Sequence, residues 1–295
     1  MGEPRRANRV AVVAALLLSA AFAPAPLHAQ VPDINAEAGV AFDDNVNRAR
    51  NPADRLSDQS YSLRLGTSRF FQVTVNSRVS LQGFAGAERF STYAGLSRTY
   101  IGAQAEFQYR ASGEFLTPTY AVFGRTSAEN HDSNLRDGYR HSVGVTVRKP
   151  VTDRIHLFGS LAHNIRDGKS TVFDTRETSA RLNFDYSLTR SGTVYLGGEY
   201  RRGDVVSTAP PSLAAIGIAE AAIRDDVFAG SFSYRIKATT FMSTLGYNLA
   251  VHERGALDFS WTRVQSTPLR SPGFAIQGSS RYVVNQIGAA YLHRF

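Results

Sequence analysis

Apolar and polar residues alternate with period two in short segments along most of this chain. In the clearest segment, Leu182, Phe184 and Tyr186 alternate with Asn183 and Asp185. Strict alternation is typical of a β-strand with one apolar and one polar face. Similar segments lie near 34–43, 61–66, 79–88, 101–110, 116–122, 139–148, 155–164, 180–188, 194–201, 226–251, 257–261 and 281–295. The pattern therefore predicts an all-β protein.

The links between these segments alternate in length. Short turns are expected at 111–113, 149–153, 189–192 and 252–255, and longer polar links near 44–58, 127–137, 166–174, 203–225 and 267–280. Short turns at one end and long loops at the other are typical of outer-membrane β-barrels, whose long loops lie outside the cell. At roughly 22 residues per strand and connection we expect about twelve strands, with ten to fourteen possible.

The N-terminus has the pattern of an export signal. Arg5, Arg6 and Arg9 precede an apolar stretch over 10–23, and Leu27-His28-Ala29 suits signal-peptide cleavage. We therefore expect residues 1–29 to be a signal peptide and 30–295 to be one domain. After residue 29 no run approaches the ~20 apolar residues of a spanning helix. A closed antiparallel up-and-down barrel is the remaining way to satisfy every backbone polar group in a membrane.

Two segments depart from the regular pattern. The aromatic-rich stretch 226–251 is too long for an ordinary strand, and we interpret it as one strand that projects beyond the membrane. Two strands there, giving fourteen in all, are the alternative. Within the longest predicted loop, Ser212 follows Pro210 and Pro211 and is a suitable N-cap for a short helix. This helix either folds inward as a constriction or stays in an outer loop.

Charge and composition narrow the function classes. The chain has 33 Lys+Arg against 25 Asp+Glu and no Cys, which excludes disulfides, thiolate metal sites and a lipidated cysteine. The arginines are spread along the chain and interleaved with acidic residues, so we expect no nucleic-acid partner. The histidines show no metal-ligand spacing. We expect no cofactor and no metal site.

The polar faces of the predicted strands carry charges of both signs. They support two interpretations: a salt-bridge lattice that braces a narrow barrel, or a pore lining whose arginines attract anions. Barrel width does not decide between them, because twelve strands enclose a space between those of filled and open barrels. The candidate pore-lining residues are Arg64, Glu106, Arg110, Arg140, Arg148, Arg181, Asp185, Glu199 and Arg201.

The last strand resembles the C-terminal assembly signal of bacterial outer-membrane barrels, since Phe295 is terminal and Tyr291 lies four residues earlier. At the position two residues before the end, His293 replaces the large apolar residue of that signal. The resemblance implies an outer membrane of a Gram-negative bacterium, with both termini in the periplasm. The expected partners are outer-membrane lipid, including lipopolysaccharide, and the barrel-assembly machinery.

Two short motifs suggest other functions. His131-Asp132-Ser133-Asn134 resembles the His-x-Ser-Asn stretch of the outer-membrane phospholipase, which implies a general base at His131 and a nucleophile at Ser133. The run 43–47, Asp-Asp-Asn-Val-Asn, has oxygen ligands suited to Ca²⁺ but lacks EF-hand spacing. Its place after the first strand resembles the barrels of surface lipoprotein assembly modifiers.

We therefore expect a narrow, porin-like channel or a structural barrel of the envelope, without enzymatic activity. One alternative is a lipid hydrolase that uses His131 and Ser133. The other is an accessory barrel for the export of surface polysaccharide or lipoprotein.

Overall fold

The computed structural model describes residues 33–270 and 281–295, which form one β-sheet unit. The predicted signal peptide and most of the predicted link 267–280 lie outside the described residues. The strands are β1 (Asp33–Asp43), β2 (Asp58–Thr74), β3 (Ser77–Phe90), β4 (Arg98–Arg110), β5 (Thr119–His131), β6 (Gly138–Thr152), β7 (Ile155–Gly168), β8 (Thr175–Ser187), β9 (Gly192–Ala209), β10 (Ala221–Arg224), β11 (Phe232–His252), β12 (Gly255–Pro268) and β13 (Tyr282–Arg294).

Twelve of these strands close into an antiparallel barrel, as the pattern predicts. Each strand from β1 to β8 pairs with the strand that follows it. β9 pairs with β11, β11 with β12, β12 with β13, and β13 with β1. The short β10 pairs only with β11. An up-and-down ring leaves no free sheet edge, so every strand finds its hydrogen-bond partners within the barrel. Among the described residues, no helix is long and apolar enough to cross a membrane.

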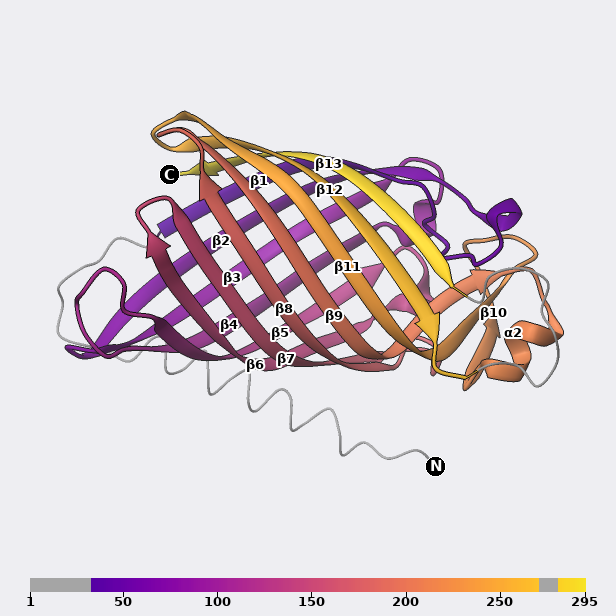
Figure 1. Cartoon of the computed structure of the whole chain (residues 1–295). Helices are drawn as coiled ribbons and strands as arrows, with labels where there is room; N and C mark the ends of the chain where they lie inside the picture. Colours follow the sequence, from indigo (N-terminus) through magenta and orange to yellow (C-terminus); the bar gives the residue numbers. More distant parts are fainter. Residues whose placement is uncertain (1–32, 271–280) are drawn as a thin grey trace. The chain divides into compact units, whose positions relative to one another are not determined.

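The connections separate the two ends of the barrel (Figure 1). The turn end holds the short connections 75–76, 111–118, 153–154, 188–191 and 253–254, together with the start of β1 and Phe295. The loop end holds 44–57, 91–97, 132–137, 169–174, 210–231 and the connection between β12 and β13. The short 3-10 helices Pro52–Asp54, Ala94–Leu96 and Asn134–Arg136 all lie in this second set.

The long aromatic-rich stretch forms a single strand that projects beyond its neighbours. β11 is 21 residues long and starts six residues above the level at which its pairing with β12 ends. Helix α2 (Leu213–Ile218) packs on this projection, and Ser212 caps it by accepting a hydrogen bond from the Ala215 N–H at 3.1 Å. Ala215 and Ile218 form an apolar cluster with Tyr234 and Ile236. The predicted strand and the predicted helix are both confirmed.

Several predicted boundaries are wrong. β7 continues to Gly168 and β6 to Thr152, although we assigned 166–174 to a link and 149–153 to a turn. β5 continues to His131 and β9 to Ala209, although we assigned 127–137 and 203–225 to links. β5 begins only at Thr119, not at Leu116. Pro118 lacks an N–H for the strand ladder, which explains the late start of β5. The polar residues that suggested a loop in β5 face inward, where polarity is compatible with a strand.

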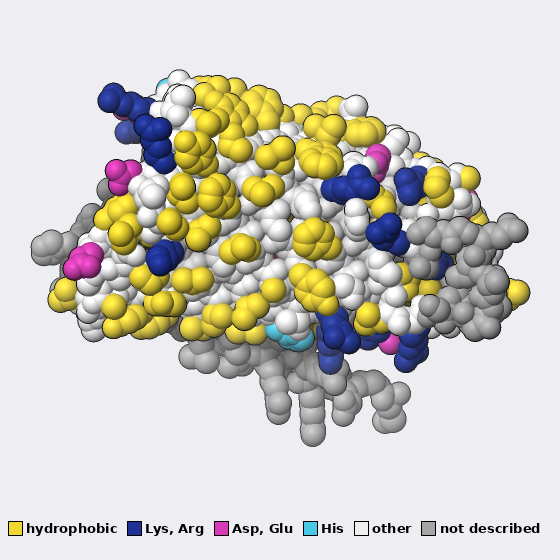
Figure 2. Space-filling view, in the orientation of Figure 1, with side chains coloured by type: hydrophobic (Ala, Val, Ile, Leu, Met, Phe, Trp, Pro, Cys, Tyr) yellow, Lys and Arg dark blue, Asp and Glu magenta, His cyan; other side chains and the backbone are white. Residues whose placement is uncertain are grey.

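Large apolar side chains cover the outer wall, where Leu63, Ile101, Leu161 and Leu182 are all more than half exposed. Figure 2 shows apolar side chains over the middle of the face in view and most of its basic side chains toward the two ends. An exposed apolar band of this kind is what a barrel presents to lipid. The alternate residues of each strand consequently face the lumen.

Candidate functional site

The inward-facing residues are identified by register, because directly paired residues lie on the same face of an antiparallel sheet. The series Glu37, Arg64, Gly86, Tyr100 and Glu129 runs across five strands in this way. The inward-facing charges divide into two halves of the barrel, which we call the cationic wall (β2–β7) and the acidic wall (β8, β9, β11–β13 and β1).

The cationic wall has twice as many arginines as carboxylates. Its inward-facing arginines are Arg64, Arg78, Arg98, Arg110, Arg125, Arg140, Arg148 and Arg166, and its carboxylates are Asp58, Glu88, Glu106 and Glu129. The acidic wall has the opposite balance. It carries Asp33, Glu37, Asp43, Glu177, Asp185, Glu199 and Asp258 against Arg181, Arg201 and Arg294.

Glu129 is the centre of the largest ion-pair cluster in the described lumen. Its carboxylate lies 3.0 Å from Arg98, 3.2 Å from Arg140 and 3.3 Å from Arg166. Arg98 also contacts Glu88 at 3.0 Å. The Glu129 side chain is only 5% exposed. Three guanidinium groups on three strands thus share one buried carboxylate, which braces this half of the barrel.

Other lumenal charges keep contact with solvent. Arg148 pairs with Glu106 at 3.3 Å, but the Arg148 side chain is 50% exposed. Arg140 remains 48% exposed although it contacts Glu129. On the acidic wall, Arg201 contacts Glu199 at 2.6 Å and Glu177 at 3.4 Å. Side chains therefore do not fill the lumen at these positions, where ion pairs and solvent-exposed charges occur side by side.

The nine predicted pore-lining residues all lie at inward-facing positions, but they belong to different walls. Arg64, Glu106, Arg110, Arg140 and Arg148 are on the cationic wall, and Arg181, Asp185, Glu199 and Arg201 are on the acidic wall. That they line a conducting pore stays a prediction. Arg110 lies at the turn end, where its guanidinium donates to the carbonyl oxygens of Glu114 and Phe115.

Sequence reasoning missed several members of the cationic wall. Glu129 and Arg166 fell within stretches assigned to links, and Arg98 and Arg125 lay beyond the most regular alternation. The outward-facing partners in β5 include Gly124, Thr126 and Ala128, which are too small or too polar to indicate a strand. The signal that could have found Glu129 is the alternation of Ser127, Glu129 and His131 with these small residues.

The loop over 44–57 is buried at the mouth of the barrel. Asn45 and Ala49 are fully buried, and the Asn45 side chain donates to the carbonyls of Ala49 and Val283. Asn47 reaches across to β9, where it exchanges hydrogen bonds with the backbone of Thr208. This loop therefore lies over the mouth on the side of the acidic wall, and α2 packs nearby on Tyr234 and Ile236, which share the inward face of β11.

Other hydrogen bonds of this loop occupy the carboxylate oxygen atoms that we considered as Ca²⁺ ligands. Asp43 accepts from Arg48 and Gln286, and Asp44 accepts from Asn285. No group of three or more His, Asp or Glu side chains in the described part of the chain is placed to hold a metal ion. The run 43–47 thus serves to fix the loop.

The loops of the two halves meet at Arg136. Its guanidinium lies 2.6 Å from Asp225 and 2.9 Å from Asp226, and it stacks 4.7 Å from the centroid of the Phe173 ring. The Arg136 side chain is 7% exposed and the Asp225 side chain is fully buried. Burial by itself raises the pKa of Asp225, but Arg136 and the hydrogen bond from Ser233 hold that pKa below its usual range.

His131 and Ser133 are not arranged as a base and a nucleophile. Ser133 donates to the Asp226 carboxylate at 2.7 Å and accepts from Arg136 at 3.0 Å. In the described chain, no hydrogen bond joins Ser133 to His131. The hydroxyl of Ser133 therefore belongs to the contacts that fix the loops.

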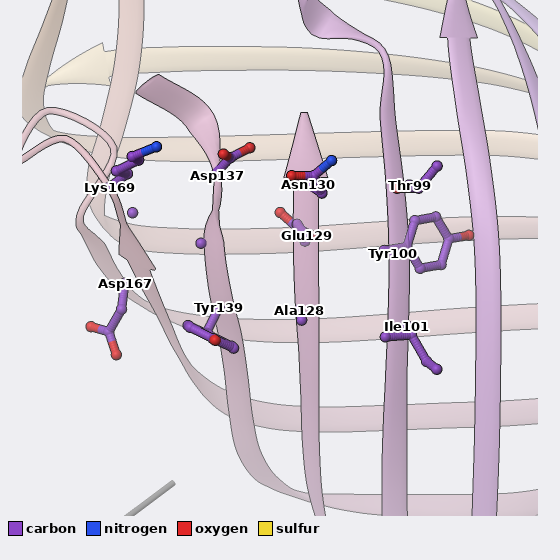
Figure 3. Close-up of a pocket in the computed structure, with 12 residues that line it drawn as sticks. Thr99, Tyr100, Ile101, Ala128, Glu129, Asn130, Asp137, Tyr139, Asp167 and Lys169 are labelled. Carbon is purple, nitrogen blue, oxygen red and sulfur yellow. The ribbon is translucent and has the colours of Figure 1, made fainter. Parts of the chain in front are cut away.

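A pocket of about 710 Å³ lies against the loop end of β4–β7, as Figure 3 shows. Its lining includes Ile101, Tyr139 and Asp167, which face outward by register. Most of the lining thus belongs to the outer wall at the level of the strand ends, although the inward-facing Tyr100 and Glu129 also contribute to it.

Tyr291 and Phe295 lie at the turn end. The Tyr291 hydroxyl is 2.8 Å from His252 Nε2, and the Phe295 N–H donates to the carbonyl of Ile34. The terminal residue is thus tied to β1 at the point where the barrel closes. Their role as an assembly signal stays a prediction.

No family model and no curated protein matches this chain. Among solved structures, an outer-membrane channel from Pseudomonas putida F1 has a TM-score of 0.57 at 11% identity, over 93% of this chain and 100% of that chain. Others are the NanC porin (TM-score 0.45, 10% identity, 88% of this chain and 98% of that chain) and the DcaP channel of Acinetobacter baumannii (0.45, 7%, 90% and 96%). The first match shows that the two chains share a β-barrel fold.

Proposed function

We propose that this protein is an outer-membrane channel for small polar and charged solutes. The observation that carries the proposal is the half-exposed state of inward-facing guanidinium groups such as Arg140 and Arg148. A guanidinium keeps its charge in all ordinary conditions and needs water or a partner. Exposure inside the barrel therefore supports a water-containing lumen rather than a packed core.

The arrangement of charge indicates how solutes cross. Anions follow the cationic wall and cations follow the acidic wall, since each is attracted to the opposite charge, and the low-dielectric walls of the lumen focus the field. The inward-facing charges of the two walls together are balanced, so we expect modest selectivity for the whole pore. The arginine excess that suggested anion preference is confined to one wall.

The proposal includes an orientation in the outer membrane. The loop end faces the outside of the cell, and the turn end with both termini faces the periplasm, as is usual for barrels with one set of long loops. The apolar outer wall contacts lipid, and the basic side chains toward the loop end contact the phosphates of lipopolysaccharide.

Planar-bilayer recording of the refolded protein tests this function. We expect stable conductance steps. Current should persist when tetramethylammonium or gluconate is the cation or anion on one side of the bilayer, and the step size should decrease when larger polymers are added. Folding is verified on a detergent gel, where a barrel that has not been heated migrates faster than the boiled chain. Folded protein that never conducts would overturn the channel and leave a structural barrel.

A further inference from the structure

Two arginines of the cationic wall flank one aromatic ring. The guanidinium carbon of Arg64 on β2 lies 5.1 Å from the centroid of Phe84, and that of Arg125 on β5 lies 4.4 Å from the same centroid. The Phe84 side chain projects inward from β3 and is 6% exposed. Contact with the face of a ring orients a guanidinium and limits its rotation.

Glycines hold this ring against the wall. Gly102 on β4 is the direct partner of Phe84, and a Cβ at Gly102 would collide with the Phe84 ring. Gly86 stands in the same relation to Tyr100, because a Cβ at Gly86 would collide with the Tyr100 ring. The two aromatic side chains thus lie over two missing side chains, which leaves space in the lumen in front of them.

The two arginines lack the counter-ions that other arginines of this wall have. Arg98, Arg140, Arg148 and Arg166 each contact a carboxylate, whereas Arg64 and Arg125 form no ion pair within the described chain. Nε of Arg64 is buried and has no hydrogen-bond partner there. Two like charges beside one ring are unfavourable without a negative partner.

The carboxylates next to these arginines in the sheet do not supply that partner. Glu37 on β1 is the direct cross-strand neighbour of Arg64, but the pair forms no ion pair. The guanidinium of Arg64 turns instead toward Phe84, on the strand at the other side. Glu129 lies on the same strand and face as Arg125, but it is already shared by three other arginines. A direct negative partner for Arg64 and Arg125 therefore has to come from solution.

We propose that Arg64 and Arg125 form a binding station for a carboxylate-bearing solute within the lumen. A guanidinium held over a ring keeps its N–H donors in a fixed fork, which matches the two oxygens of a carboxylate. The station rests on the proposed channel function only for its role in transport, since the binding itself needs no open path.

Equilibrium binding tests the station without reference to conduction. The probe is citrate, added to the folded full-length protein in detergent and followed by calorimetry. We expect the double variant Arg64→Gln/Arg125→Gln to weaken citrate binding by at least tenfold. The matched control is Arg181→Gln, which removes an arginine that forms no ion pair on the acidic wall, and should change the affinity by less than twofold.

Block of chloride current by citrate tests the station in the channel. The double variant should raise the half-blocking concentration by a similar factor, with the control unchanged. Citrate binding that is lost in the double variant, in a protein that does not conduct, would support the station and overturn the channel. Conduction with equal citrate affinity in all three proteins would overturn the station and keep the channel. A Phe84→Leu variant that folds but binds citrate as weakly as the double variant would further support the orienting role of the ring.

Discussion

The cationic and acidic walls of the lumen differ in more than the sign of their charge. On the cationic wall the charges are linked around Glu129, which three arginines share, and around Glu88 and Glu106. On the acidic wall the contacts are smaller groups, such as Arg201 with Glu199 on its own strand and Glu177 on β8, and Arg294 with Asp33 on β1. The cationic wall is therefore braced through a carboxylate that arginines from three strands share, whereas the ion pairs of the acidic wall join at most two neighbouring strands.

The loops at the ends of the two walls differ in length. The cationic wall carries the short loops 91–97, 132–137 and 169–174, and the acidic wall carries 44–57 and 210–231. The loop 44–57 is buried at the mouth, and α2 packs on β11. The comparison suggests that the acidic side limits access while the cationic side presents the charged path.

The largest effect is expected from Glu129→Gln, because it leaves three arginines of the braced wall without their shared carboxylate. Removal of one partner from a buried ion pair costs about 3–5 kcal/mol. For a barrel of this size we expect the unfolding temperature to fall by about 6–12 °C, measured as the temperature at which the fast-migrating folded band disappears. The control is Glu37→Gln, which removes a carboxylate without an ion pair and should leave that temperature nearly unchanged. Equal melting of the two variants would mean that the wall is not braced through Glu129.

The contact between the two sets of loops depends on Asp225, and Asp225→Asn breaks it. We expect a local loss of about 3 kcal/mol, seen as hydrogen exchange more than a hundredfold faster in 132–137 and 225–231. Asp226→Asn is the control, since the Asp226 side chain is 41% exposed and its change should be much smaller.

The pH dependence of this contact has a definite sign. The pKa of Asp225 is lowered in the folded protein, so its stabilising effect is present above the ordinary carboxyl pKa and is lost as pH falls below about 4. The wild type should therefore show weaker protection of the loop amides, relative to their intrinsic exchange rates, at pH 3 than at pH 6, and Asp225→Asn should lose most of this difference. A variant that retains the full pH response would assign the response to another carboxylate.

Much of this architecture could be predicted from the sequence, because strand alternation is a local property. The paired strands, the projecting β11 and the Ser212 cap all follow from residues close to one another in the chain. Strand ends were harder to place, since Ser127 and Glu129 look like loop residues until their inward position is known. The strand order of an up-and-down barrel is the sequence order, so the division into two walls was also present in the pattern.

The burial of 44–57 could not be predicted in the same way. Asn45 and Asn47 satisfy carbonyls of Val283 and Thr208, which are 238 and 161 residues away. Asp and Asn after a strand are ordinary turn residues, so nothing local indicates that they reach across the mouth. The flat position of Phe84 likewise depends on Gly102, a glycine on the neighbouring strand.

A smaller effect is expected from Gly102→Ala, which tests whether the space in front of the cationic wall depends on the flat Phe84 ring. The new methyl group must displace Phe84 or the backbone near Thr126, at a cost of about 1–3 kcal/mol. We expect a lower unfolding temperature and reduced conductance. Gly124→Ala is the matched control, because Gly124 faces outward on β5 and a Cβ there meets nothing within 4 Å. A conductance loss of equal size in both variants would show that the ring position does not matter.

The smallest effect should come from removing charge from one wall or the other. The sign of the resulting change in ion selectivity is more informative than its size. Arg64→Gln/Arg125→Gln removes two positive charges from the cationic wall, and Glu37→Gln/Asp185→Asn removes two negative charges from the acidic wall. In a salt gradient the first variant should shift the reversal potential toward cation preference and the second toward anion preference, each by a few-fold in permeability ratio, on the order of 1 kcal/mol. High salt should reduce both shifts, because screening weakens the attraction of charges exposed in the lumen. Shifts of the same sign in the two variants would contradict two separate paths. Opposite charges would then have been removed with the same effect on selectivity, which a change in the stability or width of the barrel would explain.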